Sequence, residues 1–415
     1  MIDRNGAPAL SSRGSPVRAP RTQAPAPDDP VSLVAAGLGE AFALPHPALE
    51  VCRYGNGHVN DTFLAIYETD HGRERYVHQR LAAIFEDPGK LMENIVRVTR
   101  HLRDRMLALG IADVERRCLT VVPTSTGSWW HQDGDSRAWR TYRFVEGATS
   151  IEEAAGPEEI REAGRAFGEM TALLADLGGP PLNETIHRFH DLPRRFTQLR
   201  EACAADVAGR AATAAHEVGL AISLEGIALR WSELAASREL PSRPVHNDTK
   251  LNNVLFDAPP DAPPDAPAGS PAPKAIFVVD LDTTMPGWSI CDFGDLVRTP
   301  VSPTPEDVED PSRVRVEPER FAAALDGWLG ACRHVLVGSE VEHLVFGAQA
   351  MATEVAVRFL ADHLAGDRYF RVAYPGHNLV RSRAQLALAR ELVSRGPDLE
   401  KTVAARRGGH PRYVR

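Results

Sequence analysis

The chain has few cysteines, and they are scattered. Its 415 residues include five, at Cys52, Cys118, Cys203, Cys291 and Cys332, with no CxxC pair among them. An odd number at this spacing fits neither a disulfide framework nor a zinc site. Reduced, buried thiols are the simpler interpretation, and they favour a cytoplasmic protein.

Long apolar runs and an excess of positive charge are also missing. No apolar run reaches the ~18–20 residues of a membrane span, and the N-terminus lacks the apolar core of a signal peptide. Lys and Arg number 47 against 56 Asp and Glu, a net charge of −9. We therefore expect neither nucleic acid nor a membrane as partner. The sequence gives no indication of an oligomeric state.

Composition and length predict a globular protein of two domains or lobes. Hydrophobic residues make up 43% and charged residues 25%, enough apolar material for a sizeable core. Residues 1–30 are rich in Pro, Ala, Ser and Arg and are expected to be a disordered tail. Residues 258–273 are rich in Pro and Ala and are expected to be a low-complexity loop insertion.

Residues 31–147 have the pattern of a small α+β lobe. Alternating, strand-like stretches and two stretches with helical spacing follow one another. Helices are predicted over 31–44 and 87–110, and strands within 53–68, 73–81, 119–124 and 138–147. Residues 148–415 are mostly helical, for example over 158–177 and 341–364. The fold class predicted is therefore α+β and bilobal, with the hinge near Phe144, Val145 and Glu146.

The sharpest chemical signal lies in the helical lobe. His246, Asp248 and Asn253 match the H-x-D-x-x-x-x-N catalytic loop of kinases. In such a loop the Asp orients the attacking hydroxyl and accepts its proton, while the Asn amide oxygen ligates magnesium. Lys250, between them, can neutralise the phosphoryl group during transfer.

A second signal follows 32 residues after Asp248. The apolar stretch 276–279 leads into Asp280 and Asp282. A buried strand needs no acid at its end for stability, and two acids two residues apart point to the same side and can hold a hard cation. Asp280 is therefore predicted to ligate magnesium.

A third signal lies near the start of the small lobe. Gly55, Asn56 and Gly57 fall within a strand–turn–strand pattern. Glycines there let backbone amides approach phosphates. An isolated G-x-G would otherwise indicate an ordinary hairpin, but its place upstream of the catalytic loop suits a loop that covers ATP.

Longer stretches carry a more specific resemblance. They are GNGHVNDTF, QRLAAIFEDPGKLMENIVRVT, ETIHRFHDLPRRF, HNDTKLNN, VVDLDTTMPG, DFGDLVR and VRFLADHLAGDRYFRVAYPGHNLVRSRAQ. Together they resemble the N-acetylhexosamine 1-kinases, within the aminoglycoside phosphotransferase and choline kinase group of protein-kinase-like enzymes. The resemblance implies transfer of the ATP γ-phosphate, with Mg²⁺, to the anomeric hydroxyl of N-acetylglucosamine or N-acetylgalactosamine.

The resemblance also implies roles for individual residues. Asp248 becomes the base, and Asn253 and Asp280 become the magnesium ligands. His58, Arg358 and Tyr369 match sugar-binding positions, and the hinge at Phe144 and Glu146 should receive the adenine. Gln79 stands where most kinases place a lysine that contacts ATP. Asp292-Phe293-Gly294 is not a kinase DFG sequence, and Asp292 is expected to bind backbone amides near the site.

Alternatives remain open at this point. Arg358 could simply pair with Asp362 four residues on. His187 and His190, three apart, could suggest a metal pair, but without a third ligand we expect structural or surface roles. The acceptor could instead be an aminoglycoside, choline or another small hydroxyl compound, for which an acidic pocket would be expected. A pseudokinase that binds without chemistry is the remaining alternative, although Asp248 and Asp280 are both present.

Overall fold

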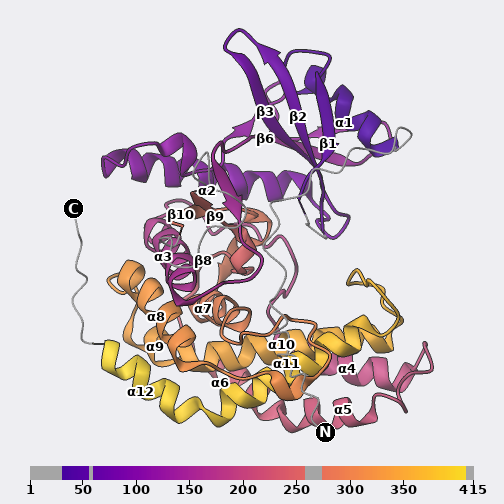
Figure 1. Ribbon diagram of the computed structural model, residues 1–415, viewed down its shortest axis with the longest axis vertical. Coiled ribbons are helices and arrows are strands. Elements are labelled where there is room, and N and C mark those ends of the chain that lie inside the picture. Colours follow the sequence, from indigo (N-terminus) through magenta and orange to yellow (C-terminus); the bar gives the residue numbers. More distant parts are fainter. Residues whose placement is uncertain (1–29, 56–58, 258–272, 408–415) are drawn as a thin grey trace, which may run out of the picture.

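The computed structural model of the protein describes residues 30–55, 59–257 and 273–407. The predicted tail and low-complexity insertion, apart from their last residues, lie outside this range. So do Asn56, Gly57 and His58. The chain forms a small sheet-containing lobe and a larger helical lobe, which confirms the α+β bilobal fold class (Figure 1). The exact lobe boundary at residue 147 stays a prediction.

An antiparallel sheet forms the small lobe, in the order β1-β2-β3-β6-β4 with β5 beside β6. Its strands are β1 (Glu50–Arg53), β2 (Asp61–Thr69), β3 (Gly72–Arg80), β4 (Val121–Val122), β5 (His131–Gln132) and β6 (Ala138–Arg143). The long strands lie where alternation predicts them. Strand β5 is not evident from the sequence pattern, and β4 is only two residues long because little of the 119–124 stretch pairs with β6.

Two helices and a 3₁₀ turn accompany this sheet. They are α1 (Pro30–Ala41), α2 (Pro88–Ala108) and η1 (Val114–Arg116). Asp87 caps the N-terminus of helix α2, since its side chain accepts a hydrogen bond from the Lys90 N–H at 3.0 Å, and Pro88 follows as the first helical residue. The helix lies between the two lobes (Figure 1). Its periodic residues Leu91, Ile95 and Val98 are buried.

The larger lobe is mostly helical. Its helices are α3 (Pro157–Leu174), α4 (Leu192–Ala205), α5 (Ala215–Ser223), α6 (Glu225–Ser237), α7 (Ser289–Arg298), α8 (Pro318–Cys332), α9 (Gly338–Glu342), α10 (Leu344–Leu364), α11 (His377–Ser394) and α12 (Gly396–Arg406). Short strands carry the site. They are β7 (Ala148–Ser150), β9 (Val254–Asp257) and β10 (Ala275–Val278) in one sheet, and β8 (Arg243–Val245) with β11 (Met285–Gly287) in another. The 3₁₀ turns are η2 (Leu251–Asn253), η3 (Leu281–Thr283) and η4 (Pro311–Arg313).

Helix α10 is long and apolar enough to pass for a membrane span by length and composition. Polar residues interrupt its apolar stretch, so a search of the sequence for a long, unbroken apolar run does not find this helix. In the structure 83% of its most apolar window is buried inside the protein. Its neighbours are α7, α11 and α4, so the core of the helical lobe accounts for its composition.

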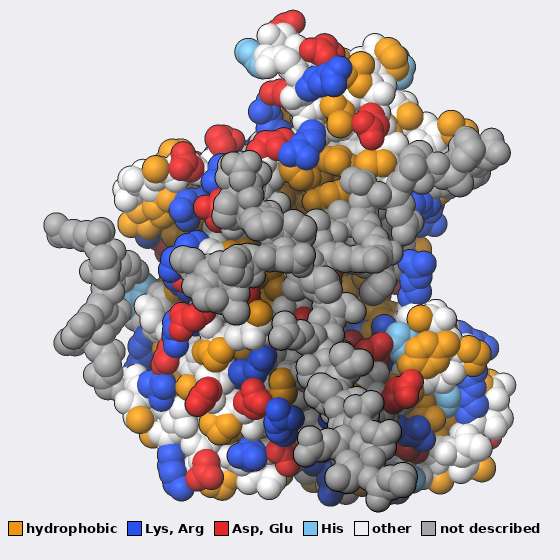
Figure 2. Space-filling view, in the orientation of Figure 1, with side chains coloured by type: hydrophobic (Ala, Val, Ile, Leu, Met, Phe, Trp, Pro, Cys, Tyr) orange, Lys and Arg blue, Asp and Glu red, His pale blue; other side chains and the backbone are white. Residues whose placement is uncertain are grey.

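The surface of the protein carries charges of both signs. Acidic and basic side chains are interspersed on the face shown in Figure 2.

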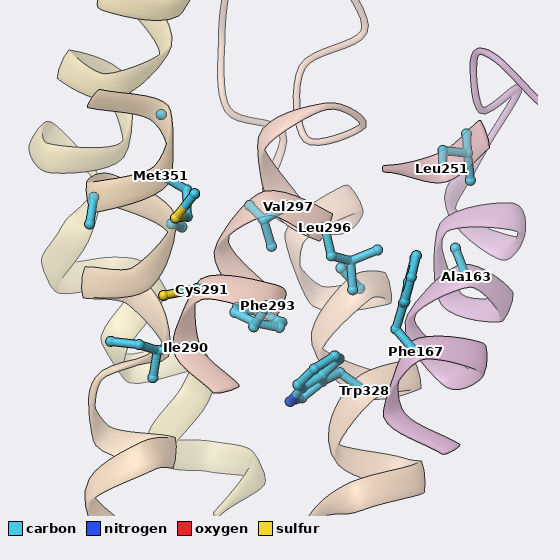
Figure 3. Close-up of a cluster of buried hydrophobic side chains, with 14 of the residues drawn as sticks. Ala163, Phe167, Leu251, Ile290, Cys291, Phe293, Leu296, Val297, Trp328 and Met351 are labelled. Atoms are coloured by element: carbon cyan, nitrogen blue, oxygen red, sulfur yellow. The ribbon is translucent and has the colours of Figure 1, made fainter. Parts of the chain in front are cut away.

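Helix α7 lies at the centre of this core. Figure 3 shows Phe293 of α7 pointing toward Trp328 of α8, and Met351 of α10 on the other side of α7. The Phe293 and Trp328 rings are 6.0 Å apart. Helices α7 and α10 approach so closely that a Cβ on Gly294 would lie 2.4 Å from the carbonyl oxygen of Gly347. Glycine at 294 is therefore a packing requirement.

We expect Gly294→Ala to destabilise the protein by about 1–3 kcal/mol, because the added methyl forces α7 away from α10. Urea denaturation would measure the change. Gly330→Ala is the matched control, since a Cβ on Gly330 in helix α8 would have no heavy atom within 4 Å, and it should gain up to about 1 kcal/mol from helix propensity. Equal effects of the two substitutions would contradict the close helix contact.

Candidate active site

The predicted catalytic loop begins directly after strand β8, and Asp292 of helix α7 holds it. The Asp292 carboxylate accepts hydrogen bonds from the backbone N–H of His246 at 2.8 Å and of Asn247 at 2.7 Å. The Thr249 hydroxyl donates to the Asp292 carbonyl at 2.5 Å. The expectation that Asp292 binds backbone amides is therefore confirmed. Asn247 has φ +64°, a left-handed conformation that asparagine tolerates better than most residues.

His246 joins this loop to the end of strand β10. Its Nε2 donates to the carbonyl of Val279 at 2.9 Å, and its Nδ1 accepts from the Asp248 N–H at 3.2 Å. One nitrogen must donate and the other must accept, so the neutral Nε2–H tautomer fits. The ring packs edge-on against Phe167 at 5.4 Å. The imidazole thus fixes the distance between the loop and the strand that leads to Asp280.

Asp248, Lys250 and Asn253 lie together as the loop motif predicts. Lys250 Nζ is 2.8 Å from Asp248 Oδ1. The Asn253 amide donates to the Asp248 carbonyl at 2.8 Å and to its carboxylate at 3.1 Å. Burial would raise the pKa of Asp248, but the charge and hydrogen bond of Lys250, with smaller contributions from His246 and Arg298, together lower the pKa below its ordinary value. The carboxylate is therefore ionised and partly charge-compensated at neutral pH.

The two carboxylates after strand β10 have different surroundings. Asp280 has φ +60° and faces the cleft, where solvent still reaches it. Loss of hydration within the cleft and the negative charges of Asp282 and Asp248 raise the pKa of Asp280 to about 7. Asp282, by contrast, is buried and paired within the protein. The pairing of Asp282 leaves Asp280 as the acid of this pair that can reach a cation, and its role as a magnesium ligand stays a prediction.

Asp282 links the lobes. Its carboxylate forms an ion pair with Arg140 of strand β6 and accepts a hydrogen bond from the Asn60 side chain at 2.7 Å. The Arg140 guanidinium also donates to Gln79 Oε1 from Nε at 3.0 Å and from Nη2 at 2.8 Å. Arg140 is 1% exposed. Gln79, in place of a lysine, is thus the neutral partner of a buried cation that comes from the neighbouring strand.

A cavity between the lobes adjoins these groups. Its lining comes from the residues after β1, from strands β2, β3 and β6, from the hinge, and from the segments that carry Asn253 and Asp280. It includes Tyr54, Gly55, Thr62, Val77, Gln79, Arg140, Tyr142, Phe144, Val145, Asn253, Val279 and Asp280. The predicted nucleotide-binding residues Gly55, Gln79 and Phe144 lie within this set. Glu146 does not, because its carboxylate is held by Arg75, whose Nε donates to it at 2.9 Å. The hinge reaches the cavity through Phe144 and Val145.

Arg358 and Tyr369 lie together at the end of helix α10. Arg358 Nη2 donates to the Tyr369 hydroxyl at 3.3 Å, and its guanidinium lies 5.3 Å from the ring centroid of Phe189. The pairing of Arg358 with Asp362 is wrong. Asp362 instead accepts the backbone N–H groups of residues 368, 369 and 370 at 2.9, 2.8 and 2.9 Å, and thereby shapes the loop that carries Tyr369.

The residues present fit a hard divalent cation at Asn253 and Asp280. Asn253 uses its amide nitrogen toward Asp248, which leaves its oxygen as an acceptor. The Asp280 carboxylate has no hydrogen bond among the described residues. Within the described ranges no group of three His, Cys, Asp or Glu could hold a metal. Two protein oxygens suit Mg²⁺, which takes its other ligands from phosphates and water.

Sequence reasoning missed Arg140 and Glu354 as parts of the site. Arg140 lies in β6, where five consecutive residues are buried, and an arginine within such a strand signals a buried ion pair. Glu354 lies in the apolar helix α10 and is 1% exposed. Both were detectable as charges inside apolar segments, but their partners are distant in sequence.

The two-lobed fold, the loop around Asp248 and the cavity beside it define a kinase-like phosphotransferase for small molecules. A model of the phosphotransferase enzyme family (APH) matches residues 50–330, more than half of the chain, and the chain belongs to this family.

Solved structures show the same fold. A spectinomycin phosphotransferase in complex with ADP and spectinomycin is 12% identical, with a TM-score of 0.52 over 88% of this chain and 99% of that one. A protein from Ralstonia eutropha JMP134, described as an aminoglycoside phosphotransferase, is 15% identical, with a TM-score of 0.51 over 88% and 98%. At this identity the likeness concerns the fold alone.

We expect Gln79→Lys to destabilise the protein by about 2–3 kcal/mol, because Arg140 loses its acceptor and faces a second cation. Gln79→Glu is the matched variant, since it keeps an acceptor for the guanidinium. Its melting temperature should stay closer to wild type, while its charge should raise the KM for ATP. Thermal melts and nucleotide titrations would measure both. A lysine variant as stable as wild type, with a lower KM for ATP, would contradict the role of Arg140.

The buried Asp292 carboxylate should make the stability of the protein depend on pH. Burial raises the pKa of Asp292 to about 6, above the 3.8 of a free carboxyl. A raised pKa in the folded state means that stability present below about pH 4 is lost as pH rises through 6. Wild type should therefore lose up to about 3 kcal/mol relative to Asp292→Asn between pH 4 and pH 6.5. Paired urea denaturation curves would measure this, and a relative gain with rising pH would show the opposite shift.

Proposed function

We propose that this protein is an ATP-dependent kinase that phosphorylates the anomeric hydroxyl of N-acetylhexosamines, giving the sugar 1-phosphate. One observation carries the phosphotransferase part of this proposal. The Asp248 carboxylate, with Lys250 at 2.8 Å and the Asn253 amide at 3.1 Å, lies in a loop whose residue Asn253 lines the same cavity as Asp280. This is the set of groups that phosphoryl transfer requires.

The nucleotide is proposed to occupy the cavity between the lobes. Adenine would lie against Phe144 and Val145 of the hinge, and the strands that flank the glycine loop would cover the phosphates. The spectinomycin phosphotransferase of the same fold binds ADP, which supports a nucleotide here. Asn56, Gly57 and His58 lie outside the described residues, so their roles at the phosphates and the sugar rest on the sequence.

In the proposed mechanism Asp248 orients the acceptor hydroxyl. Its lowered pKa keeps it ionised, so it accepts a hydrogen bond from the hydroxyl. It takes the proton as the hydroxyl oxygen bonds to the γ-phosphorus, while the bond from that phosphorus to the β–γ bridging oxygen breaks and ADP leaves. Lys250 lies beside it and can neutralise the transferring phosphoryl group. Asn253 and Asp280 would hold magnesium, which when bound neutralises charge on the phosphates. Catalysis then depends mainly on positioning and electrostatic stabilisation.

The charge near Arg358 bears on the choice of acceptor. Arg195, Arg358 and His190 surround the buried carboxylate of Glu354. With three groups able to carry positive charge around one acid, this region disfavours a cationic amine such as choline or an aminoglycoside. It favours a neutral sugar whose hydroxyls accept hydrogen bonds from a guanidinium. We propose that the sugar lies beside Arg358 and Tyr369, and that the protein acts in the cytoplasm.

An acceptor panel with Mg-ATP tests the substrate. It would contain N-acetylglucosamine, N-acetylgalactosamine, glucose, galactose, kanamycin and choline, with ATP consumption as the readout. We expect turnover of an N-acetylhexosamine and a product that mild acid hydrolyses, as it does an anomeric phosphate. Turnover of an amine alone would keep the fold and mechanism and reject the sugar. ATP binding without any turnover would favour the pseudokinase.

We expect Asp248→Asn to lower kcat by about 10²–10⁴-fold with little change in melting temperature, because it removes the base without removing packing. Asp398→Asn, on the surface of helix α12, is the matched control and should keep wild-type turnover. Near-wild-type kcat in the Asp248 variant would reject its role as base.

A further inference from the structure

The catalytic loop has a second anchor besides Asp292. The carbonyl of Asn247 accepts a hydrogen bond from Nε2 of His190 at 3.0 Å. His190 lies in the segment before helix α4, far from the loop in sequence, and its side chain is 9% exposed. Its other ring nitrogen, Nδ1, lies 3.1 Å from the Glu354 carboxylate of helix α10. One imidazole thus bridges the catalytic loop and the central helix of the large lobe.

Both partners of His190 can only accept hydrogen bonds. A backbone carbonyl and an ionised carboxylate have no proton to donate, so both ring nitrogens must carry one. The geometry therefore requires the imidazolium form. In a neutral tautomer, one ring nitrogen would carry a lone pair that faces either the Asn247 carbonyl or the Glu354 carboxylate. Two acceptor atoms would then face each other inside the protein without a proton between them, which is costly.

The surrounding charges agree with this form. The groups that face His190 are Glu354 and Arg358 on α10, Arg195 on α4 and Asp292 on α7. Burial opposes the charged ring, but the charge and hydrogen bond of Glu354 outweigh it and raise the pKa of His190. Glu354 is itself 1% exposed and needs a cation, and His190 makes the closest ion pair to it, at 3.1 Å against 3.6 Å for Arg195 and 3.9 Å for Arg358.

We propose that His190 is a positioning residue for catalysis: as an imidazolium it fixes the carbonyl of Asn247, and so the backbone next to Asp248, relative to Glu354 and Arg358 at the proposed acceptor site. This rests on the proposed function in that Asp248 is taken as the base. Asp292 holds the N–H groups on one side of the loop, and His190 holds a carbonyl of the same turn. The acceptor site and the base are thereby joined through a single chain of contacts from Arg358 to Glu354 to His190 to Asn247.

The test compares two histidines of one segment. His190→Gln places an amide whose nitrogen donates at one end while its oxygen can only accept at the other, so one of the two acceptors loses its donor. His187→Gln is the matched control, because the His187 side chain is 74% exposed and pairs with the surface residue Glu184. We expect His190→Gln to lower kcat by about 10–100-fold through misplacement of the base, with the KM for ATP within about twofold of wild type. His187→Gln should match wild type in both constants.

Backbone amide hydrogen exchange tests the role of His190 without any acceptor substrate. In His190→Gln, peptides that cover residues 246–250 should exchange at least several-fold faster, while those of helix α12 should not change. If no sugar is turned over by wild type, the proposed substrate fails while hydrogen exchange still tests His190. Exchange and kcat equal to those of His187→Gln would overturn the proposal, and so would a uniform increase in exchange over the whole lobe, which would indicate a merely structural role.

Glu354→Gln completes a double-mutant cycle. If His190 acts through its pair with Glu354, the two substitutions together should cost clearly less in kcat than the product of their separate effects. Multiplicative losses would show that His190 positions the loop independently of Glu354 and would overturn the link to the acceptor site.

Discussion

The position of the candidate catalytic loop depends on one buried carboxylate. Asp292 binds two successive N–H groups, those of His246 and Asn247, and this fixes a turn in which Asn247 has a left-handed conformation. The carboxylate can do so because α7 is buried along its whole length. The close contact of Gly294 with Gly347 in turn sets the distance of α7 from α10. A packing constraint between two glycines thus determines where the chemistry can take place.

A second buried carboxylate joins the lobes. In kinases of related fold a lysine on the third strand contacts the nucleotide phosphates. Here the corresponding side chain is Gln79, and the buried cation is Arg140 of the neighbouring strand, paired with Asp282. Breaking such a pair by removing one partner leaves an uncompensated charge inside the protein. We infer that Gln79 and Arg140 form one unit, so that the glutamine is matched to the arginine and is no sign of lost function.

Sequence reasoning predicted the features that are local. The fold class, the long strands of the small lobe, helix α2 and the order of the motifs all follow from periodicity and spacing over a few residues. It did not find Arg140 with Asp282, or His190 with Glu354, because these partners are separated by 142 and 164 positions and only the fold brings them together. Strand alternation also places the two acids after β10 on one side, from which both could reach one cation, although Asp280 alone is predicted as a ligand. The chain in fact turns into η3 after Asp280, and the alternation ends there.

The fold balances the charges of this site by bringing acidic and basic residues together in pairs. Three acids of the site each have a cationic partner: the buried Asp282 has Arg140, the buried Glu354 has His190, and the half-buried Asp248 has Lys250. Asp280 faces the cleft without such a partner among the described residues, and the neighbouring acids help to raise its pKa to about 7. An unpaired carboxylate with this property is costly in the free protein, and a cation that binds it relieves that cost. The carboxylate that lacks a cationic partner is therefore the one proposed to bind the magnesium ion.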